Sequence, residues 1–176
     1  MFRVRELDRK RDRRGVEGVD TAFETSSVFD LVTLDCSIEL VERALPSPLV
    51  KSYSIAEVFA GWARWKDGWV AEAEDGTIVG FATVEHEPWH QRLILWFLYI
   101  APAWRRRGVG RALLAEVETH ARSLRATHVW LETSNVNVPG FRAYQRLGYT
   151  LCGADAHYYG AYMPGETAIY MAKTLG

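Results

Sequence analysis

The chain has 176 residues, of which 48% are hydrophobic and seven are tryptophan, a composition that excludes a disordered protein. The formal net charge of −1 excludes a general electrostatic attraction to nucleic acids or to anionic membranes. The longest apolar runs are too short to span a bilayer, and the basic N-terminus lacks the apolar core of a secretory signal. We therefore expect a single domain over residues 1–176, without nucleic-acid or membrane partners.

The two cysteines, Cys36 and Cys152, are far apart in the chain. Such sparse cysteine usage is typical of a reduced compartment, so we expect a cytoplasmic protein. Neither cysteine lies in a recognisable catalytic or metal-binding motif, and we expect no metal site.

The first third of the chain carries the weaker structural signals. Residues 2–7 alternate apolar and charged side chains and are predicted to form an edge strand. The charge run from Arg9 to Arg14 is interpreted as a solvated helix face, because Asp8 and Asp12 interrupt it and no aromatic residues interleave with it as in a nucleic-acid patch. From Gly15 to Ser27 we expect a helix end followed by a loop.

The following segments favour strands and then a helix. β-Branched and aromatic residues predict strands or a hairpin over Ser27–Asp35 and Ser37–Arg43, and the prolines at positions 46 and 48 are expected to end this region. A helix is predicted over residues 54–65, where Ser54 and Glu57 have the spacing of a capping box.

The pattern becomes regular from Trp69 onward. Strands are predicted over Trp69–Ala73 and Thr77–Glu85, joined by a hairpin turn at Asp75-Gly76, and a polar turn is expected from His86 to Gln91. Leu93–Ile100 is apolar without alternation, which predicts a strand buried on both faces. A helix with Leu113, Val117, Ala121 and Leu124 on one face should follow and end near Arg125.

The last third predicts three strands and a helix. A strand is expected over His128–Thr133, a helix from Asn137-Val138-Pro139 to a stop at Gly148, and a closing pair of strands over Thr150–Tyr159 and Glu166–Lys173. A strand meander followed by alternating strands and helices indicates an α/β fold with a mixed sheet.

The entrance to the central helix has the features of an anion site. Three consecutive arginines, Arg105 to Arg107, precede Gly108-Val109-Gly110. The first backbone N–H groups of a helix lack intrahelical partners, and glycines let a ligand approach the backbone, so a pyrophosphate would fit here. A solvated basic loop before a helix is the alternative. A dinucleotide-binding fingerprint fits less well, because Leu113 occupies the third glycine position and no acidic residue follows at the ribose position.

Two motifs in this order resemble the GNAT superfamily of N-acetyltransferases. Arg105-x-x-Gly108-x-Gly110 is similar to the acetyl-CoA signature of that family, and Asn137, followed seven positions later by Tyr144 and then by Leu147-Gly148-Tyr149, is similar to its second signature. The resemblance covers about Val70 to Leu175. It implies a mostly antiparallel, mixed α/β sheet of six or seven strands, with helices on both faces and a splayed central strand pair.

The resemblance also implies acetyl-CoA as cosubstrate and assigns residues to it. Asn137 would bind the pantetheine arm, and the backbone of Leu98 and Ile100 would pair with the same arm like an additional strand. The residues expected to bind acetyl-CoA are Leu98, Tyr99, Ile100, Arg105, Arg106, Arg107, Gly108, Val109, Gly110, Arg111, Asn137 and Gly140.

Tyr144 is the candidate general acid. A phenol can donate a proton to the departing CoA thiolate, and the resemblance places this tyrosine beside the thioester sulfur. The alternative is a packing aromatic, the role we expect for Phe141.

The general base is less clearly marked, because Leu93–Ile100 lacks the acidic residue that many GNAT members carry there. Glu132 is the preferred substitute: it lies in an apolar strand, and its spacing to Tyr144 resembles the base–acid pair of bacterial enzymes that acetylate ribosomal protein N-termini. A structural carboxylate is the alternative for Glu132, and Glu85, acting through water, is the reserve base.

The acceptor is less constrained by the sequence. The stretches 130–153 and 166–175 are similar to streptothricin acetyltransferases, which modify an amine of that antibiotic. We expect N-acetylation of a primary amine of a small molecule, with a protein N-terminal or lysine acetyltransferase and a non-catalytic acetyl-CoA-binding module as alternatives. A homodimer is a further expectation.

Overall fold

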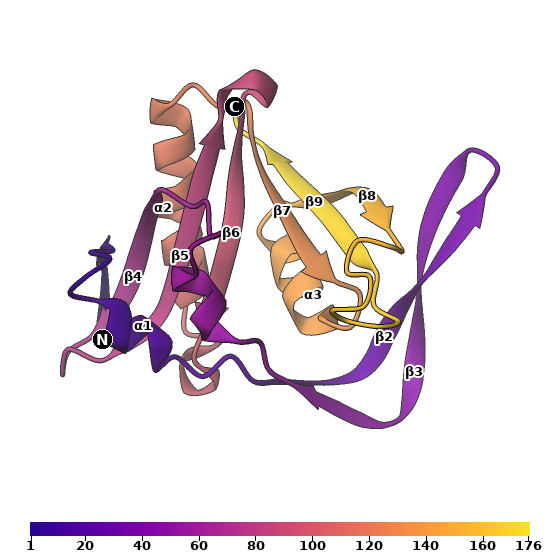
Figure 1. The fold of residues 1–176 in the computed structure, drawn as a ribbon, viewed down its shortest axis with the longest axis horizontal. Coiled ribbons are helices and arrows are strands. Elements are labelled where there is room, and N and C mark those ends of the chain that lie inside the picture. The colour runs from indigo at the N-terminus through magenta and orange to yellow at the C-terminus, as the bar shows by residue number, and fades with distance from the viewer. The chain divides into compact units, whose positions relative to one another are not determined.

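The computed structural model describes residues 1–176, which form two compact units (Figure 1). Unit 1 comprises Met1–Ala22, Ser52–Val129 and Leu175–Gly176, and unit 2 comprises Phe23–Lys51 and Trp130–Thr174. None of the helices combines the length and the apolar character that a membrane span needs. Both cysteines are free and exposed.

Unit 1 contains four antiparallel strands. They are β1 (Phe2–Glu6), β4 (Asp67–Ala73), β5 (Ile78–Glu87) and β6 (Arg92–Ile100), in this spatial order. The predicted edge strand at the N-terminus is confirmed, as is the hairpin between β4 and β5. Gly76 has φ 83°, and the Thr77 amide donates to the Asp75 side chain at 2.9 Å, so this turn uses both expected residues.

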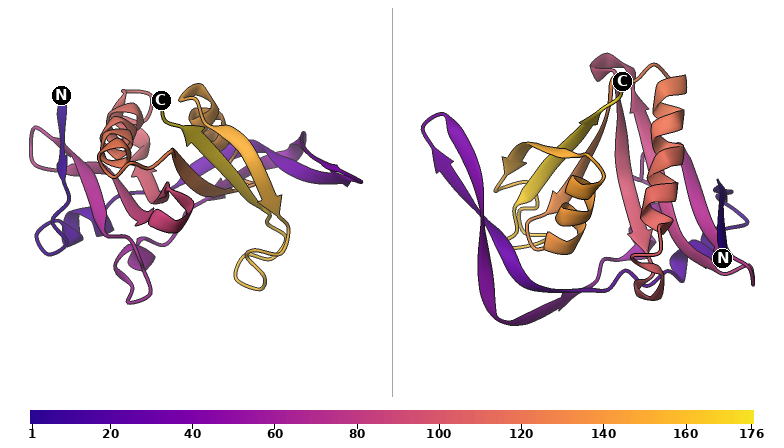
Figure 2. Two further views of the ribbon diagram at one scale, coloured as in Figure 1. Left: turned by 90° about the horizontal axis from the view of Figure 1, so that it is seen from above. Right: turned by 180° about the vertical axis from the view of Figure 1, so that it is seen from behind.

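The helices of unit 1 are mostly short. They are α1 (Arg13–Glu17), the 3₁₀ helices η1 (Ile55–Phe59), η2 (Pro88–His90) and η3 (Pro102–Trp104), and α2 (Val109–Ser123). Helix α2 lies against β4, β5 and β6 (Figure 2). Its predicted face is confirmed, since Leu113, Val117 and Ala121 are fully buried, whereas Leu124 lies beyond its end and is half-buried.

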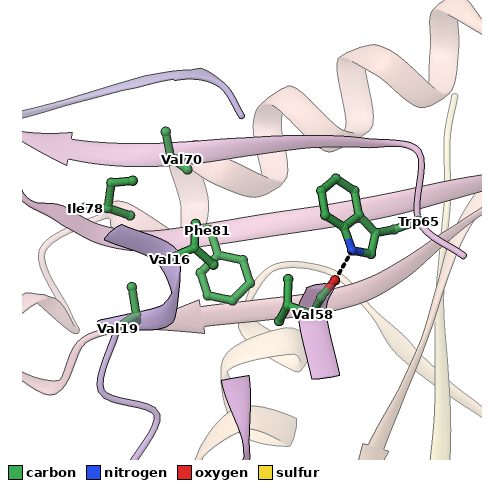
Figure 3. Close-up of a cluster of buried hydrophobic side chains, with 7 residues drawn as sticks. All are labelled: Val16, Val19, Val58, Trp65, Val70, Ile78 and Phe81. Atoms are coloured by element: carbon green, nitrogen blue, oxygen red, sulfur yellow. Dashed lines mark hydrogen bonds between the residues drawn. The ribbon is translucent and has the colours of Figure 1, made fainter. Parts of the chain in front are cut away.

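A hydrophobic cluster joins the N-terminal segment of unit 1 to its strands (Figure 3). Its buried members are Val16, Val19, Val58, Trp65, Val70, Ile78 and Phe81. The indole of Trp65 donates a hydrogen bond to the carbonyl of Val58, which fixes η1 on this cluster. The helix predicted over residues 54–65 is therefore limited to η1: Ala60 is already extended, and Ser54 makes no side-chain cap.

The charge run near the N-terminus is not simply a solvated helix face, because Asp12 is buried. The Arg5 guanidinium donates to both oxygens of Asp12, at 2.7 and 2.9 Å, and also contacts Glu72 on β4 at 3.0 Å. These contacts hold the pKa of Asp12 well below its usual range, against the opposing effect of burial. Helix α1 is confined to five residues and includes Gly15, which the sequence placed at a helix end.

Unit 2 combines three strands, a helix and a long hairpin. The strands β7 (His128–Ser134), β9 (Ala168–Thr174) and β8 (Thr150–Asp155) are neighbours in this order, and α3 spans Val138–Arg146. Strands β8 and β9 confirm the predicted closing pair with shorter bounds, and Gly148, at φ 90°, follows the last turn of α3 as predicted. The seven strands of these two groups and the helices give the mixed, mostly antiparallel α/β fold that the sequence predicts.

The hairpin is longer than predicted. Strands β2 (Phe23–Leu34) and β3 (Ser37–Lys51) form a separate two-stranded ribbon that twists along its length (Figure 1). Pro46 and Pro48 were expected to end this region, but they lie between the paired residues Ala44 and Leu49, where the register shifts. Proline is tolerated there because an irregularity at a free sheet edge needs no backbone donor.

Strand β6 differs from its expected burial. Leu93 and Leu95 are buried, but the residues from Trp96 to Ile100 are half-buried, so burial on both faces is wrong for the second half of the strand. The pairing of β5 with β6 also shifts between Thr83 and Val84, which leaves Trp96 in a bulge. The splay of the central strands and the single domain over residues 1–176 stay predictions.

Candidate active site

The N-terminus of α2 in unit 1 has the features of the predicted anion site. Gly108 is its N-cap residue at φ 87°, no side chain caps the helix, and the first turn contains no acidic residue. The first backbone bond into the helix runs from the Ala112 amide to the Gly108 carbonyl at 3.0 Å, so the amides of Val109, Gly110 and Arg111 have no intrahelical acceptor. Together with the helix dipole, these donors favour a phosphate group.

The arginines around the start of α2 differ in exposure. Arg105 is half-buried, its Nε donates to the Ile100 carbonyl at 3.0 Å, and desolvation lowers its pKa. Arg106, Arg107 and Arg111 are exposed. Arg105 therefore ties the loop to the end of β6, and the exposed guanidinium groups are the ones that remain available for phosphates.

The residues expected to pair with the pantetheine arm lie at the end of β6. Leu98 pairs with Ala82 and Ile100 with Gly80 across the β5–β6 ladder, and both side chains are half-buried, as is that of Tyr99. The Ile100 carbonyl already accepts the hydrogen bond from Arg105, so its share in binding the arm would be reduced.

Asn137 caps α3 in unit 2. Its Oδ1 accepts from the Gly140 amide at 3.1 Å, and its Nδ2 donates to Thr133 Oγ1 at 3.1 Å. A Cβ atom at Gly140 would lie 2.4 to 2.7 Å from atoms of the Asn137 side chain, so that side chain would have to move. Asn137 therefore caps α3, and Gly140 leaves the space that this cap needs.

Gly140→Ala is expected to destabilise the protein by about 1 kcal/mol, because the new Cβ displaces the Asn137 cap. Asn137→Ala removes the same cap directly. Chemical denaturation of both single variants and the double variant checks this coupling: the double variant should lose less stability than the sum of the two. Additive losses would show that Gly140 and Asn137 act independently.

Glu132 is a half-buried carboxylate on β7. The half-buried Trp130 and Glu132 alternate with Val129, Leu131 and Thr133, which are buried. The Tyr159 hydroxyl donates a hydrogen bond to Glu132 Oε1. Desolvation raises the pKa of Glu132 to about 7, and the negative charge of Glu166 adds to the rise, while the Tyr159 hydrogen bond opposes it.

Glu166 belongs to an ion pair beside Glu132. Its carboxylate is paired with Lys51 from β3 and accepts a hydrogen bond from the Ser134 hydroxyl. Its negative charge is thus compensated locally, whereas Glu132 has a phenol as its partner. This difference favours Glu132 as the carboxylate that exchanges a proton.

Tyr144 lies on α3, close enough to Glu132 for the charge of that carboxylate to affect its pKa. Burial raises its pKa, and the negative charge of Glu132 raises it further, so Tyr144 keeps its proton at working pH. Its ring packs edge to face on Tyr149, with centroids 5.7 Å apart. Phe141 is buried and packs on Phe29 at 4.8 Å, which confirms its predicted packing role.

Glu85, the reserve base, lies on β5 in unit 1. Its Oε2 accepts from the Trp96 indole at 3.0 Å, and its Oε1 lies 3.3 Å from the Arg64 guanidinium. Unit 2 thus brings together Tyr144, Glu132, Asn137 and Gly140, and the remaining predicted site residues belong to unit 1. No sequence motif marks Tyr159 or Glu166, because the loop between β8 and β9 brings them to β7.

Residues 38–149 match the model of the Acetyltransferase (GNAT) family, and the chain belongs to that family. It is an acetyl-CoA-dependent N-acetyltransferase. The chain is 37% identical to a streptothricin acetyltransferase of Streptomyces lavendulae, over 92% of this chain and 89% of that protein.

Solved structures give the same fold. A nourseothricin acetyltransferase superimposes with a TM-score of 0.89 at 34% identity, covering 99% of each chain. A Bacillus anthracis str. Ames protein in complex with acetyl coenzyme A has a TM-score of 0.83 at 22% identity, covering 100% of this chain and 99% of that one. The GNAT fold expected from the two sequence motifs is therefore confirmed.

Proposed function

We propose that this enzyme transfers the acetyl group of acetyl-CoA to an amine of a streptothricin-type antibiotic. The observation that carries the proposal is the 37% identity to the Streptomyces lavendulae streptothricin acetyltransferase over most of both chains. The likeness to a nourseothricin acetyltransferase supports the same substrate class.

In the proposed reaction, unit 1 binds the cosubstrate. The free amides of Val109, Gly110 and Arg111 donate to the pyrophosphate, and the exposed Arg106 and Arg107 add positive charge. The backbone of Leu98 pairs with the pantetheine arm, and Ile100 contributes less because its carbonyl accepts from Arg105. Arg105 acts indirectly, since it holds the loop against Ile100.

Unit 2 supplies the proton transfers. The amine nitrogen attacks the thioester carbonyl, Glu132 accepts the proton that the amine loses, and the C–S bond breaks. A pKa of about 7 leaves Glu132 mostly ionised in mildly alkaline solution and still basic enough to accept a proton. Tyr144 remains protonated and donates its hydrogen bond to the departing sulfur as negative charge develops there.

A screen for acetyl-CoA consumption tests the substrate. Streptothricin should be turned over with the highest kcat/KM in a panel that also contains aminoglycosides, polyamines and peptides with free N-termini or lysines. Preference for a peptide would replace the proposal with protein acetylation. Acetyl-CoA binding without turnover of any member would favour a binding module.

Acetyl-CoA should raise the thermal stability of the enzyme, because it binds the folded state alone. Gly108→Leu is expected to abolish this rise, since a side chain at the α2 N-cap obstructs the phosphates. Gly76→Leu is the matched control: Gly76 has φ 83° and Gly108 has φ 87°, and the Cβ of either would meet no other atom within 4 Å. Both variants carry similar backbone strain, so loss of the acetyl-CoA effect in both, or in neither, would contradict the phosphate assignment.

We also propose that residues 1–176 act as one acetyltransferase domain in the cytoplasm and that the enzyme is a homodimer. Light scattering after size-exclusion chromatography tests the homodimer: the expected mass is twice the 20.0 kDa of the chain. Cell fractionation tests the location.

A further inference from the structure

The surroundings of Glu85 differ from those of an ordinary surface ion pair. The Glu85 side chain is only 13% exposed, whereas the side chain of its partner Arg64 is 71% exposed. A shielded carboxylate is thus covered by a solvated guanidinium through one contact of 3.3 Å. Because the Arg64 side chain is mostly in solvent, it loses little hydration or packing when another cation takes its place beside Glu85.

Glu87, two residues further along β5, has closer basic partners than Glu85 has. Both Arg92 Nε and His90 Nδ1 lie 2.6 Å from Glu87 Oε2, so this carboxylate has two close partners. Burial acts to raise the pKa of Glu87, but these two hydrogen bonds hold it below its usual value. Glu87 is therefore committed to its own neighbours, and Glu85 is the carboxylate that can accept an external cation.

One indole contacts Glu85 and a second indole lies beside the first. The bulge on β6 directs the Trp96 indole to Glu85, and the ring of Trp62 lies 6.4 Å from that of Trp96, tilted by 50°. Trp62 is 56% exposed, although tryptophan is usually buried more completely. Indole faces are the side-chain surfaces that bind ammonium and guanidinium groups best.

The position of Glu85, Trp62 and Trp96 within unit 1 fits a substrate site. From Ile100, beside the N-terminus of α2, β6 runs back to Trp96 over about 13 Å, at about 3.3 Å per residue. That distance is comparable to the length of an extended pantetheine arm. A cofactor whose phosphates lie at α2 and whose arm follows β6 would bring its acetyl end toward Trp96.

We propose that Glu85, Trp62 and Trp96 bind a positively charged group of the acceptor, an ammonium or guanidinium, in the place that Arg64 occupies. This inference rests on the proposed function, because it requires a cationic small-molecule acceptor. It gives Glu85 a role in substrate recognition in place of the reserve role as a base.

Steady-state kinetics with streptothricin test the subsite. Glu85→Gln should raise KM about ten-fold, which corresponds to about 1.4 kcal/mol, with kcat and the pH profile unchanged. Glu87→Gln is the matched control and should leave KM unchanged. Arg64→Ala should lower KM, because it removes the competing guanidinium. An unchanged KM in Glu85→Gln, or a pH-dependent fall in its kcat, overturns the subsite.

Calorimetry with agmatine, which carries one ammonium and one guanidinium, separates this inference from the choice of substrate. The wild-type enzyme should bind agmatine and the Glu85→Gln variant should bind it at least about five-fold more weakly, as expected for the loss of a charge-assisted contact. Equal affinity of the two proteins, or no binding to the wild type, overturns the subsite. Failure of the wild type to acetylate streptothricin, with agmatine binding intact, would reject the proposed substrate alone.

Discussion

Tyr144→Phe is expected to lower kcat about 10² to 10⁴-fold, the usual contribution of a general acid or base. The affinity for acetyl-CoA should be retained, because the variant loses only the hydroxyl that assists the departing thiolate. Burial and the charge of Glu132 both keep the phenol neutral, so the loss should be similar across the working pH range. Single-turnover rates and acetyl-CoA binding, measured on the same preparation, check both statements.

Tyr149→Phe is the control for this experiment. Tyr149 is fully buried and its ring lies 5.7 Å from that of Tyr144, so the substitution removes a neighbouring phenol hydroxyl from the same part of unit 2. We expect its kcat to stay close to the wild-type value. Full activity of Tyr144→Phe, or an equal loss in both variants, would assign Tyr144 a packing role.

Features set by neighbouring residues were predicted well from the sequence. The Asp75-Gly76 turn, the start of α2 after Gly108 and the end of α3 before Gly148 depend on backbone angles that glycine adopts easily, so short motifs identify them. The buried face of α2 follows from helical spacing alone. These elements fix where the predicted anion site and Tyr144 lie within their units.

Features set by distant contacts were predicted poorly. Asp12 is buried because strand pairing places Arg3 opposite Glu72 and brings Arg5 beside the same carboxylate, an arrangement that no local pattern reveals. The helix expected over residues 54–65 has the right capping residues, but the packing of Val58 and Trp65 limits it to one short turn. Tertiary contacts override local preference in both segments.

In the candidate site, too, the residues within one helix were predictable and the distant partners were not. Asn137 and Tyr144 are recognisable because their spacing is set by one helix, α3. Tyr159, which donates to Glu132, lies in the loop between β8 and β9, and a loop imposes no fixed spacing on the residues that it brings to a site. The sequence could therefore indicate the carboxylate but not the group that positions it.

Glu132→Gln is expected to lower kcat/KM about 10² to 10⁴-fold near neutral pH, because it keeps the shape of the side chain and removes the base. In the wild type, activity should rise as the pH increases through about 7, where Glu132 ionises. The variant should lack this transition and recover in part at high pH, where more of the amine is already deprotonated. A pH–rate profile from about pH 5 to 10 checks these expectations across the two ionisations.

The same substitution should increase stability at alkaline pH. The folded-state pKa of Glu132 is raised from 4.5 to about 7, so the native protein binds the proton more tightly than the unfolded chain does. The protonated carboxyl stabilises the folded protein fully at pH values below the pKa of the unfolded state. This stabilisation is lost as the pH rises through the pKa of the folded state, a change of about 3 kcal/mol in the free energy of unfolding. Glutamine is neutral throughout, so the variant should equal the wild type in acid and exceed it in stability above about pH 8.

Tyr159→Phe distinguishes a catalytic Glu132 from a structural one. The Tyr159 hydrogen bond lowers the pKa of Glu132, so its removal should move the rising limb of the wild-type pH–rate profile to higher pH. A structural Glu132 predicts a different set of results: Glu132→Gln would lose stability, both variants would keep their activity per folded molecule, and neither pH–rate profile would move. In that outcome the enzyme draws the neutral amine from solution and releases its proton through water. The two variants measured together therefore decide whether the carboxylate on β7 takes the proton.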